Sequence, residues 1–268
     1  MTEASITMTD SAAQQASSVS VLDAARLAAG LRSSLAHHER IEGKQLSPLM
    51  AYLSRWQSLR LSRTHADMLA DPRFSQGAHF FLEDIYAAKD FSQRDYDGQR
   101  IYNFMNRFLP EAALAPLAMA LEVNLLTQEL DMTLAEVMHD KLGIVDRFSQ
   151  EQYDEGYRLC DNYAVRVRQI ELIVAVGKQL EKVRRLPFIT TTLRVARGPA
   201  QRLGWHEMQD FLERGYEAWK ATKDPGKFLS NIERRELAIL DRIYGIPEGA
   251  PDNNPFLVSD GGSPRIEL

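Results

Sequence analysis

The chain has 268 residues, of which 44% are hydrophobic and 26% are charged, and its formal net charge at pH 7 is -5. This composition is typical of a globular protein and excludes a fibrous or wholly disordered chain. The net negative charge argues against general coating of nucleic acid, so we do not expect nucleic acid as a partner.

The cysteine content and the hydropathy indicate in which compartment the protein is expected. Cys160 is the only cysteine, so the chain cannot form an intrachain disulfide, a thiolate zinc site or a CxxC redox motif. The first twenty residues lack the basic and continuous apolar regions of a signal peptide. Apolar runs fall short of the roughly 18 to 20 residues that span a bilayer. We therefore expect a cytoplasmic protein without membrane insertion.

Helix signals recur along the chain, whereas the alternating Val, Ile, Thr and aromatic residues typical of strands are nearly absent. We predict an all-α fold, a single bundle of about eight helices around one long central helix. In chain order, the helices are expected over residues 21–41, 48–70, 72–87, 92–109, 116–142, 150–186, 188–197, 205–221 and 225–244. The second is expected to break near residues 62–64.

The predicted boundaries depend on capping residues, prolines and glycines. The starts are Ser47-Pro48, Asp71-Pro72, Pro116, the capping-box pair Ser149 and Gln152, and Asp224-Pro225. The stops are Gly143, Gly198-Pro199 and Gly245. The helix that begins after Ser149 carries an uninterrupted apolar stripe to residue 186, so it is expected to be the longest, on the order of 50 Å, and to form the centre of the bundle.

Both ends of the chain are predicted to be disordered. Residues 1–20 are rich in Ser, Thr, Ala and Gln, and residues 246–268 are rich in Pro, Gly, Asn and Ser. Since no linker-like region interrupts the residues between these tails, residues 21–245 are predicted to form one helical domain.

A dense group of polar residues follows the third predicted helix, in the phrase HFFLEDIYAAKDFSQRD. His79 and Glu83 are four apart and would share one helix face. Two interpretations are open: a polar site walled by phenylalanines, or a helix corner in which carboxylates and an arginine cap a helix and fix the turn. The candidate residues are His79, Glu83, Asp84, Tyr86, Asp90, Arg94 and Asp95.

An acidic stripe follows the helix predicted over residues 116–142. Glu136 and His139 have the Glu-x-x-His spacing by which helical-bundle di-iron proteins present two metal ligands. The chain has no second Glu-x-x-His, so a metal site would also need Glu83 and Glu122. The other interpretation is a solvated acidic stripe with a surface histidine. Iron is the expected cofactor only if Glu83, Glu122, Glu136 and His139 form a site; otherwise no cofactor is predicted.

A basic segment covers residues 178–202. Between residues 178 and 204 seven Lys and Arg side chains stand against Glu181 alone, a balance of +6, so the rest of the chain carries -11. Such cations can stabilise the negative end of a helix dipole, or they can bind an anion, an acidic ligand or a protein partner. The candidate binding residues are Arg184, Arg185, Arg194, Arg197 and Arg202. A homodimer through the apolar stripe of the long helix also stays open.

Several phrases resemble those of a known family. They are FFLEDIY, KDFSQRD, LEVNLLTQELD, FLERGYEAW and FLSNIERRE. In this combination the chain resembles a family of uncharacterised bacterial helical proteins, a domain of unknown function, over residues 49–244. The resemblance implies a bacterial source and a helical single domain, and it implies no activity.

Two hypotheses of function follow. The first is a non-catalytic cytoplasmic interaction or regulatory module that acts through the basic surface of residues 178–202. The second is a metal-dependent oxidoreductase of the di-iron or haem-oxygenase-like helical type. They differ in geometry: a metal site needs the acidic stripe and the His79 corner to converge on one cavity, whereas an interaction module leaves the stripe facing solvent.

Overall fold

The computed structural model describes residues 46–85, 111–204 and 206–246. These residues form nine α-helices and one π-helix and contain no strand, so the all-α prediction is confirmed for them. In this part of the chain no helix is long and apolar enough to cross a membrane. The helices predicted over residues 21–41 and 92–109 lie outside the described residues, as do both predicted tails apart from Ile246.

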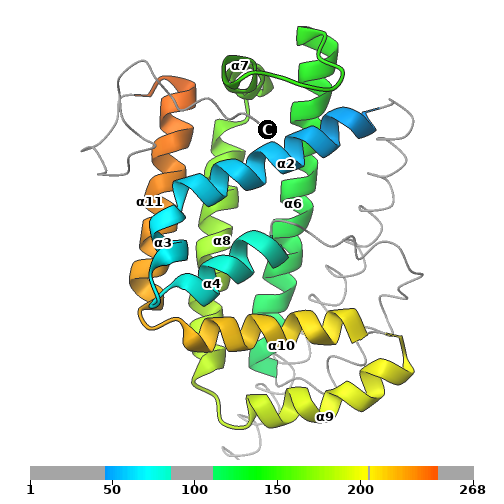
Figure 1. Ribbon diagram of the computed structural model, residues 1–268, viewed down its shortest axis with the longest axis vertical. Coiled ribbons are helices and arrows are strands. Elements are labelled where there is room, and N and C mark those ends of the chain that lie inside the picture. Colours follow the sequence, from blue (N-terminus) through cyan, green and yellow to red (C-terminus); the bar gives the residue numbers. More distant parts are fainter. Residues whose placement is uncertain (1–45, 86–110, 205, 247–268) are drawn as a thin grey trace, which may run out of the picture.

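Three long helices lie side by side: α6 (Glu111–Leu142), α8 (Tyr163–Arg184) and α11 (Pro225–Tyr244), with α8 between the other two (Figure 1). The helix α2 (Ser47–Thr64) crosses them obliquely, and α3 (Ala66–Ala70) follows it beside α11. One end of the bundle carries α7 (Gln150–Cys160), and the other end is crossed by α9 (Ile189–Arg202) and α10 (His206–Ala221).

The core follows from the apolar stripes of these helices. Near α7, Trp56 lies against Tyr153 with ring centroids 4.0 Å apart, in the largest cluster of buried apolar side chains. Nearer α10, Phe228 and Trp219 meet edge to face in a second cluster. Gly177 lets α11 approach α8 closely, because a Cβ at this position would clash with Cδ2 of Leu229.

Two predicted helix starts and two predicted stops, Gly143 and Gly245, are confirmed. The Ser149 side chain accepts a hydrogen bond from the backbone N–H of Gln152, whose side chain accepts one from the Ser149 N–H, as the capping box requires. The Asp224 side chain accepts from the N–H of Lys227. Gly245 ends α11 in the left-handed conformation, with φ 68°.

Predictions based on proline were less accurate. The helix α6 begins at Glu111, five residues before Pro116, although it ends before Gly143 as predicted. The helix α9 does not stop at Gly198 but continues through Pro199 to Arg202. Proline removes the hydrogen bond to the carbonyl of Val195, which is on the exposed face, where water can replace it. Beyond the proline Ala200 is fully buried, so packing continues the helix.

The Asp71-Pro72 signal marks a turn rather than a helix start. The Asp71 side chain accepts from the backbone N–H of Arg73, and α4 (Ser75–His79) begins only after this turn. A π-helix, η1 (Phe80–Ile85), follows directly. At the start of α2, Ser47 is the first helical residue and makes no cap; the N-cap position belongs to Leu46. The predicted break near residues 62–64 is found at His65, between α2 and α3.

The helix predicted to run without interruption over residues 150–186 is two helices. Asp161 adopts the left-handed conformation, with φ 50°, and Asn162 follows it before α8 begins at Tyr163. Asp and Asn tolerate this conformation better than most residues, because their short polar side chains can bond locally. The longest described helix is therefore α6, with 32 residues, while the central position is held by α8.

The break at Asp161 can be tested with two substitutions that remove the same carboxylate. In the left-handed conformation glycine is favoured over alanine, by about 1 kcal/mol. We therefore expect Asp161→Gly to be more stable than Asp161→Ala, as measured by urea unfolding. In one continuous helix the order would be reversed, because alanine is the better helix former by about 1 kcal/mol.

Candidate functional site

The structure describes only part of the polar corner predicted around His79. His79 is exposed at the end of α4, and Glu83 and Asp84 belong to η1. Residues 80–85 thus continue α4 as a π-helix and not as the α-helix expected over residues 72–87. Tyr86, Asp90, Arg94 and Asp95 lie outside the described residues, so this site stays a prediction.

The candidate metal ligands on α6 lie toward the surface. Glu122 forms an ion pair with Arg168 of α8 at 3.4 Å, and both side chains are more than a third exposed. His139 bonds through Nδ1 to its neighbour Asp140 at 2.8 Å. Within residues 46–85, 111–204 and 206–246, no three His, Cys, Asp or Glu side chains lie close enough together to hold a metal ion.

Two arginines of the predicted basic surface are paired within the chain, although the Arg197 side chain is 58% exposed. Arg184 donates to the carbonyl of Thr222 at 3.2 Å and to Glu181 at 2.8 Å, which fastens the end of α8 to the end of α10. Arg197 of α9 forms a bidentate ion pair with Glu213 of α10. Since their charges are balanced, Arg184 and Arg197 contribute little to any binding of an external anion.

Arg185, Arg194 and Arg202 remain exposed on the same part of the chain. Arg185 lies 3.2 Å from Glu181, which also takes a bond from Arg184. Arg194 and Arg202 form no hydrogen bond or ion pair with another described residue. These three arginines are therefore the part of the predicted basic surface whose charge is available to a partner.

Large apolar side chains are exposed beside these arginines, which the sequence analysis did not predict. Phe188 is 78% exposed, Val195 61% and Leu203 51%. They account for half of the large hydrophobic residues exposed in the part of the chain that the structure describes. Phe188 is the N-cap residue of α9, in the left-handed conformation with φ 68°, Val195 lies within the helix, and Leu203 is its C-cap residue. We call the outward side chains of residues 185, 188, 194, 195, 202 and 203 the α9 surface.

The opposite face of α9 fixes its position. Leu193, Ala196 and Ala200 are buried on this face. Gln209 of α10 donates to the carbonyl of Leu193 at 2.7 Å and to Glu213 at 2.8 Å. The hydrogen bonds from Arg197, and then those from Gln209, lower the pKa of Glu213 against the opposing effect of burial, so the carboxylate stays charged and keeps α9 against α10.

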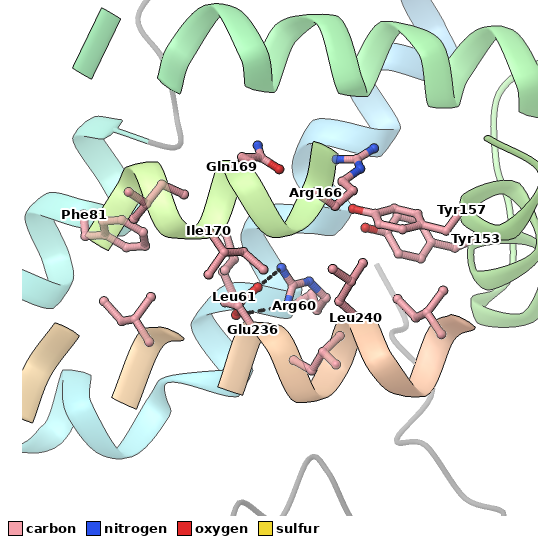
Figure 2. Close-up of a pocket in the computed structure, with 14 residues that line it drawn as sticks. Arg60, Leu61, Phe81, Tyr153, Tyr157, Arg166, Gln169, Ile170, Glu236 and Leu240 are labelled. Carbon is pink, nitrogen blue, oxygen red and sulfur yellow. Dashed lines mark hydrogen bonds and ion pairs between the residues drawn. The ribbon is translucent and has the colours of Figure 1, made fainter. Parts of the chain in front are cut away.

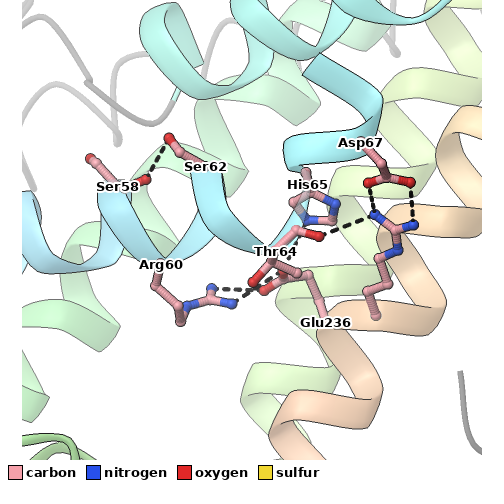
Figure 3. Close-up of polar contacts among 8 residues, drawn as sticks. Ser58, Arg60, Ser62, Thr64, His65, Asp67 and Glu236 are labelled. Atoms are coloured by element: carbon pink, nitrogen blue, oxygen red, sulfur yellow. Dashed lines mark hydrogen bonds and ion pairs between the residues drawn. The ribbon is translucent and has the colours of Figure 1, made fainter. Parts of the chain in front are cut away.

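A buried ionic cluster, not predicted from the sequence, joins the first and last described helices (Figure 3). Glu236 of α11 accepts two bonds from Arg60 of α2, at 2.7 and 3.2 Å, and one contact from Nε2 of His65 at 3.0 Å. Arg60 and Glu236 have side chains only 14% exposed. The adjacent Arg235 forms a bidentate pair with Asp67 of α3, at 2.6 and 2.7 Å.

The sequence contains a signal for this cluster. On α11 the buried apolar residues are Phe228, Leu229, Ile232, Ile239, Leu240 and Ile243. The same spacing of three and four residues places positions 235 and 236 on this buried face, where apolar residues are expected. Charged residues are almost never buried unless they are paired, so Arg235-Glu236 at these positions predicts oppositely charged partners elsewhere in the chain.

A second polar cluster lies at the contact of α2, α6 and α8. Arg166 donates to the carbonyl of Leu130 at 3.0 Å, and its guanidinium lies 4.3 Å from the ring centre of Tyr157. Asp131 accepts from Gln57 at 3.0 Å and lies 3.8 Å from Arg166. Burial raises the pKa of Asp131, and these two neighbours partly offset the effect.

A small cavity separates the two clusters (Figure 2). Its volume is about 50 Å³, and Arg60, Glu236, Arg166, Tyr153 and Gln169 are among its walls. A cavity of this kind holds ordered water once it exceeds roughly 10–15 Å³ and offers polar partners. Because the carboxylates already bind the arginines around it, we interpret this region as a hydrated structural core that joins α2, α8 and α11.

The cluster should make stability depend on pH. Burial alone would raise the pKa of Glu236, but the Arg60 charge and the bond from His65 outweigh burial and lower it from 4.5 to about 2. A lowered pKa contributes stability above the unfolded value, and this contribution is lost as the pH falls from 4.5 toward 2. Glu236→Gln should cost about 3 kcal/mol at pH 7 and flatten this acid dependence, measured by urea unfolding across pH.

The control for this substitution is Glu217→Gln. Glu217 pairs with Lys220 at 3.8 Å on the surface, and both side chains are more than half exposed. Removal of such a pair should change the free energy of unfolding by less than about 1 kcal/mol. Equal losses in the two variants would contradict the buried role of Glu236.

Residues 36–249 match the family described as Domain of unknown function (DUF8198), so the chain belongs to this family. The resemblance to an uncharacterised family is thereby confirmed. No curated protein and no solved structure matches the chain.

Proposed function

We propose that this protein is a non-catalytic interaction module and that the α9 surface is its binding site. The observation that carries this proposal is the combination, on α9 and its two cap residues at the end of the bundle, of large exposed apolar side chains with two arginines that form no hydrogen bond or ion pair with a described residue. Contiguous exposed apolar residues with a polar rim are typical of protein interaction sites. Arginine and aromatic residues are also those that contribute most to interfaces.

The chemistry of the surface defines the partner. Phe188 and Val195 need apolar side chains to cover them, and Arg194 and Arg202 need carboxylates. In a homodimer, α9 of one copy would pack against α9 of the other about a two-fold axis at Val195. The two copies of Arg194 would then lie close together, and their like charges oppose such a contact. The expected partner is therefore a different protein with an acidic, partly apolar surface.

The location is also part of the proposal. A cytoplasmic protein is supported by the single cysteine, which gives the chain no disulfide to stabilise it in an oxidising compartment. A bacterial source is supported by the resemblance of the sequence to bacterial helical proteins.

The proposal can be tested by photo-crosslinking in cells. A photoreactive amino acid replaces Val195 in the full chain, and crosslinked proteins are identified by mass spectrometry. We expect a specific partner whose crosslinking falls at least tenfold when Arg194 and Arg202 are both replaced by Glu, because the electrostatic attraction becomes repulsion. Replacement of acidic residues of the partner by Lys should restore binding to this variant.

The control places the same changes at the other end of the molecule. Val145 and Arg147 are exposed in the connection between α6 and α7, remote from α9. A photoreactive group at residue 145 should not capture the partner, and Arg147→Glu should not weaken its binding. A partner captured equally from residue 145, or retained after the charge reversal of α9, would contradict the proposal.

A further inference from the structure

An apolar cavity lies beneath α9, separate from the α9 surface. It has a volume of about 110 Å³ and is bounded by side chains from η1, α6, α8, α9 and α10. Its walls include Pro116, Val176, Leu180, Leu193, Phe211 and Trp219, and no charged side chain is among the described residues that line it. The cavity is about twice the volume of the polar one beside Glu236 and opposite to it in chemistry.

The size and the lining of the cavity favour an uncharged organic ligand over water. An apolar cavity offers water too few hydrogen-bond partners, and one of about 150 Å³ is enough to bind benzene. The hydroxyl of Thr192, one of the few polar groups in the wall, already donates to the carbonyl of Phe188 at 3.0 Å. The space here is smaller, about 110 Å³, so the ligand can be no larger than a single ring.

Trp219 supplies a second, independent observation. Its side chain lines the cavity, and its indole N–H is buried without a hydrogen-bond partner among the described residues. A buried donor without an acceptor destabilises a folded protein, and most native donors are satisfied. One residue of the cavity wall thus carries a buried donor that no described acceptor satisfies.

We propose that this cavity binds a small, uncharged, mainly apolar molecule that carries one hydrogen-bond acceptor for the indole N–H of Trp219. Benzonitrile and toluene are suitable probes, because they are similar in size and only the nitrile accepts a hydrogen bond. A ligand held here contacts α8, α9 and α10 together and stabilises the end of the bundle that carries α9.

The first experiment measures binding to the full chain. Benzonitrile at ten times its Kd should raise the melting temperature by about 3 °C, since a ligand bound only to the folded state stabilises it. Saturation-transfer NMR should show magnetisation reaching the aromatic protons of the probe. The absence of both signals would overturn the proposal.

Two substitutions on α8 test the location. Val176 lines the cavity, whereas Val174 is buried in the apolar cluster around Phe228 and does not line it. Val176→Phe should fill the space, leave the melting temperature unchanged or raised, and weaken benzonitrile at least tenfold. Val174→Phe should lower the melting temperature, because no described cavity receives the added atoms. Equal destabilisation by both would overturn the proposal, since it would mean that the space is already filled by this chain.

A third substitution tests the hydrogen bond. Trp219→Phe removes the indole donor and keeps an aromatic wall. The affinity for benzonitrile relative to toluene should fall at least threefold in this variant. An unchanged ratio would overturn the role assigned to the indole N–H.

Discussion

The pairing of the buried side chains of Arg235 and Glu236 with residues 60–67 is the interaction on which the rest of the structure depends. It joins α11 to α2 and α3, which are separated from it by about 170 residues of sequence. Buried charges are tolerated only with well-placed partners, so α2, α3 and α11 have one favourable arrangement. That arrangement places α2 across α8 and closes the apolar core around Trp56 and Tyr153 (Figure 1).

The opposite end of the bundle is organised by α9, whose two faces differ in chemistry. The inner face contributes Ile189 and Leu193 to the apolar cavity. The outer face carries Val195 and exposed arginines, and Phe188 is exposed at the N-cap. The pair between Arg197 and Glu213 holds α9 against α10. The proposed partner site and the proposed ligand site therefore share one helix but use opposite sides of it.

Local signals predicted those features that short segments determine by themselves. The capping box at Ser149, the Asp224 cap and the Gly245 stop depend on residues within one helical turn, and each was read correctly. Tertiary packing determined the features that were predicted wrongly. Because Ala200 is buried, α9 continues through Pro199. The apolar stripe is continuous across Asp161, so it gave no sign of the break there. The charge composition predicted the basic segment, but it could not predict that Arg184 and Arg197 bind residues elsewhere in the chain. The ionic cluster could have been inferred in part from Arg235-Glu236, although its partners could not.

A double-mutant cycle between Arg60 and Glu236 tests most directly whether this buried pairing joins the helices. Arg60→Met, Glu236→Leu and the double variant are compared by urea unfolding at pH 7. Each single change leaves one buried charge without its partner, so the double variant should lose less than the sum of the two, with a coupling free energy of about 2 kcal/mol or more. Additivity within about 0.5 kcal/mol would contradict the account, because the two side chains would then contribute to stability independently.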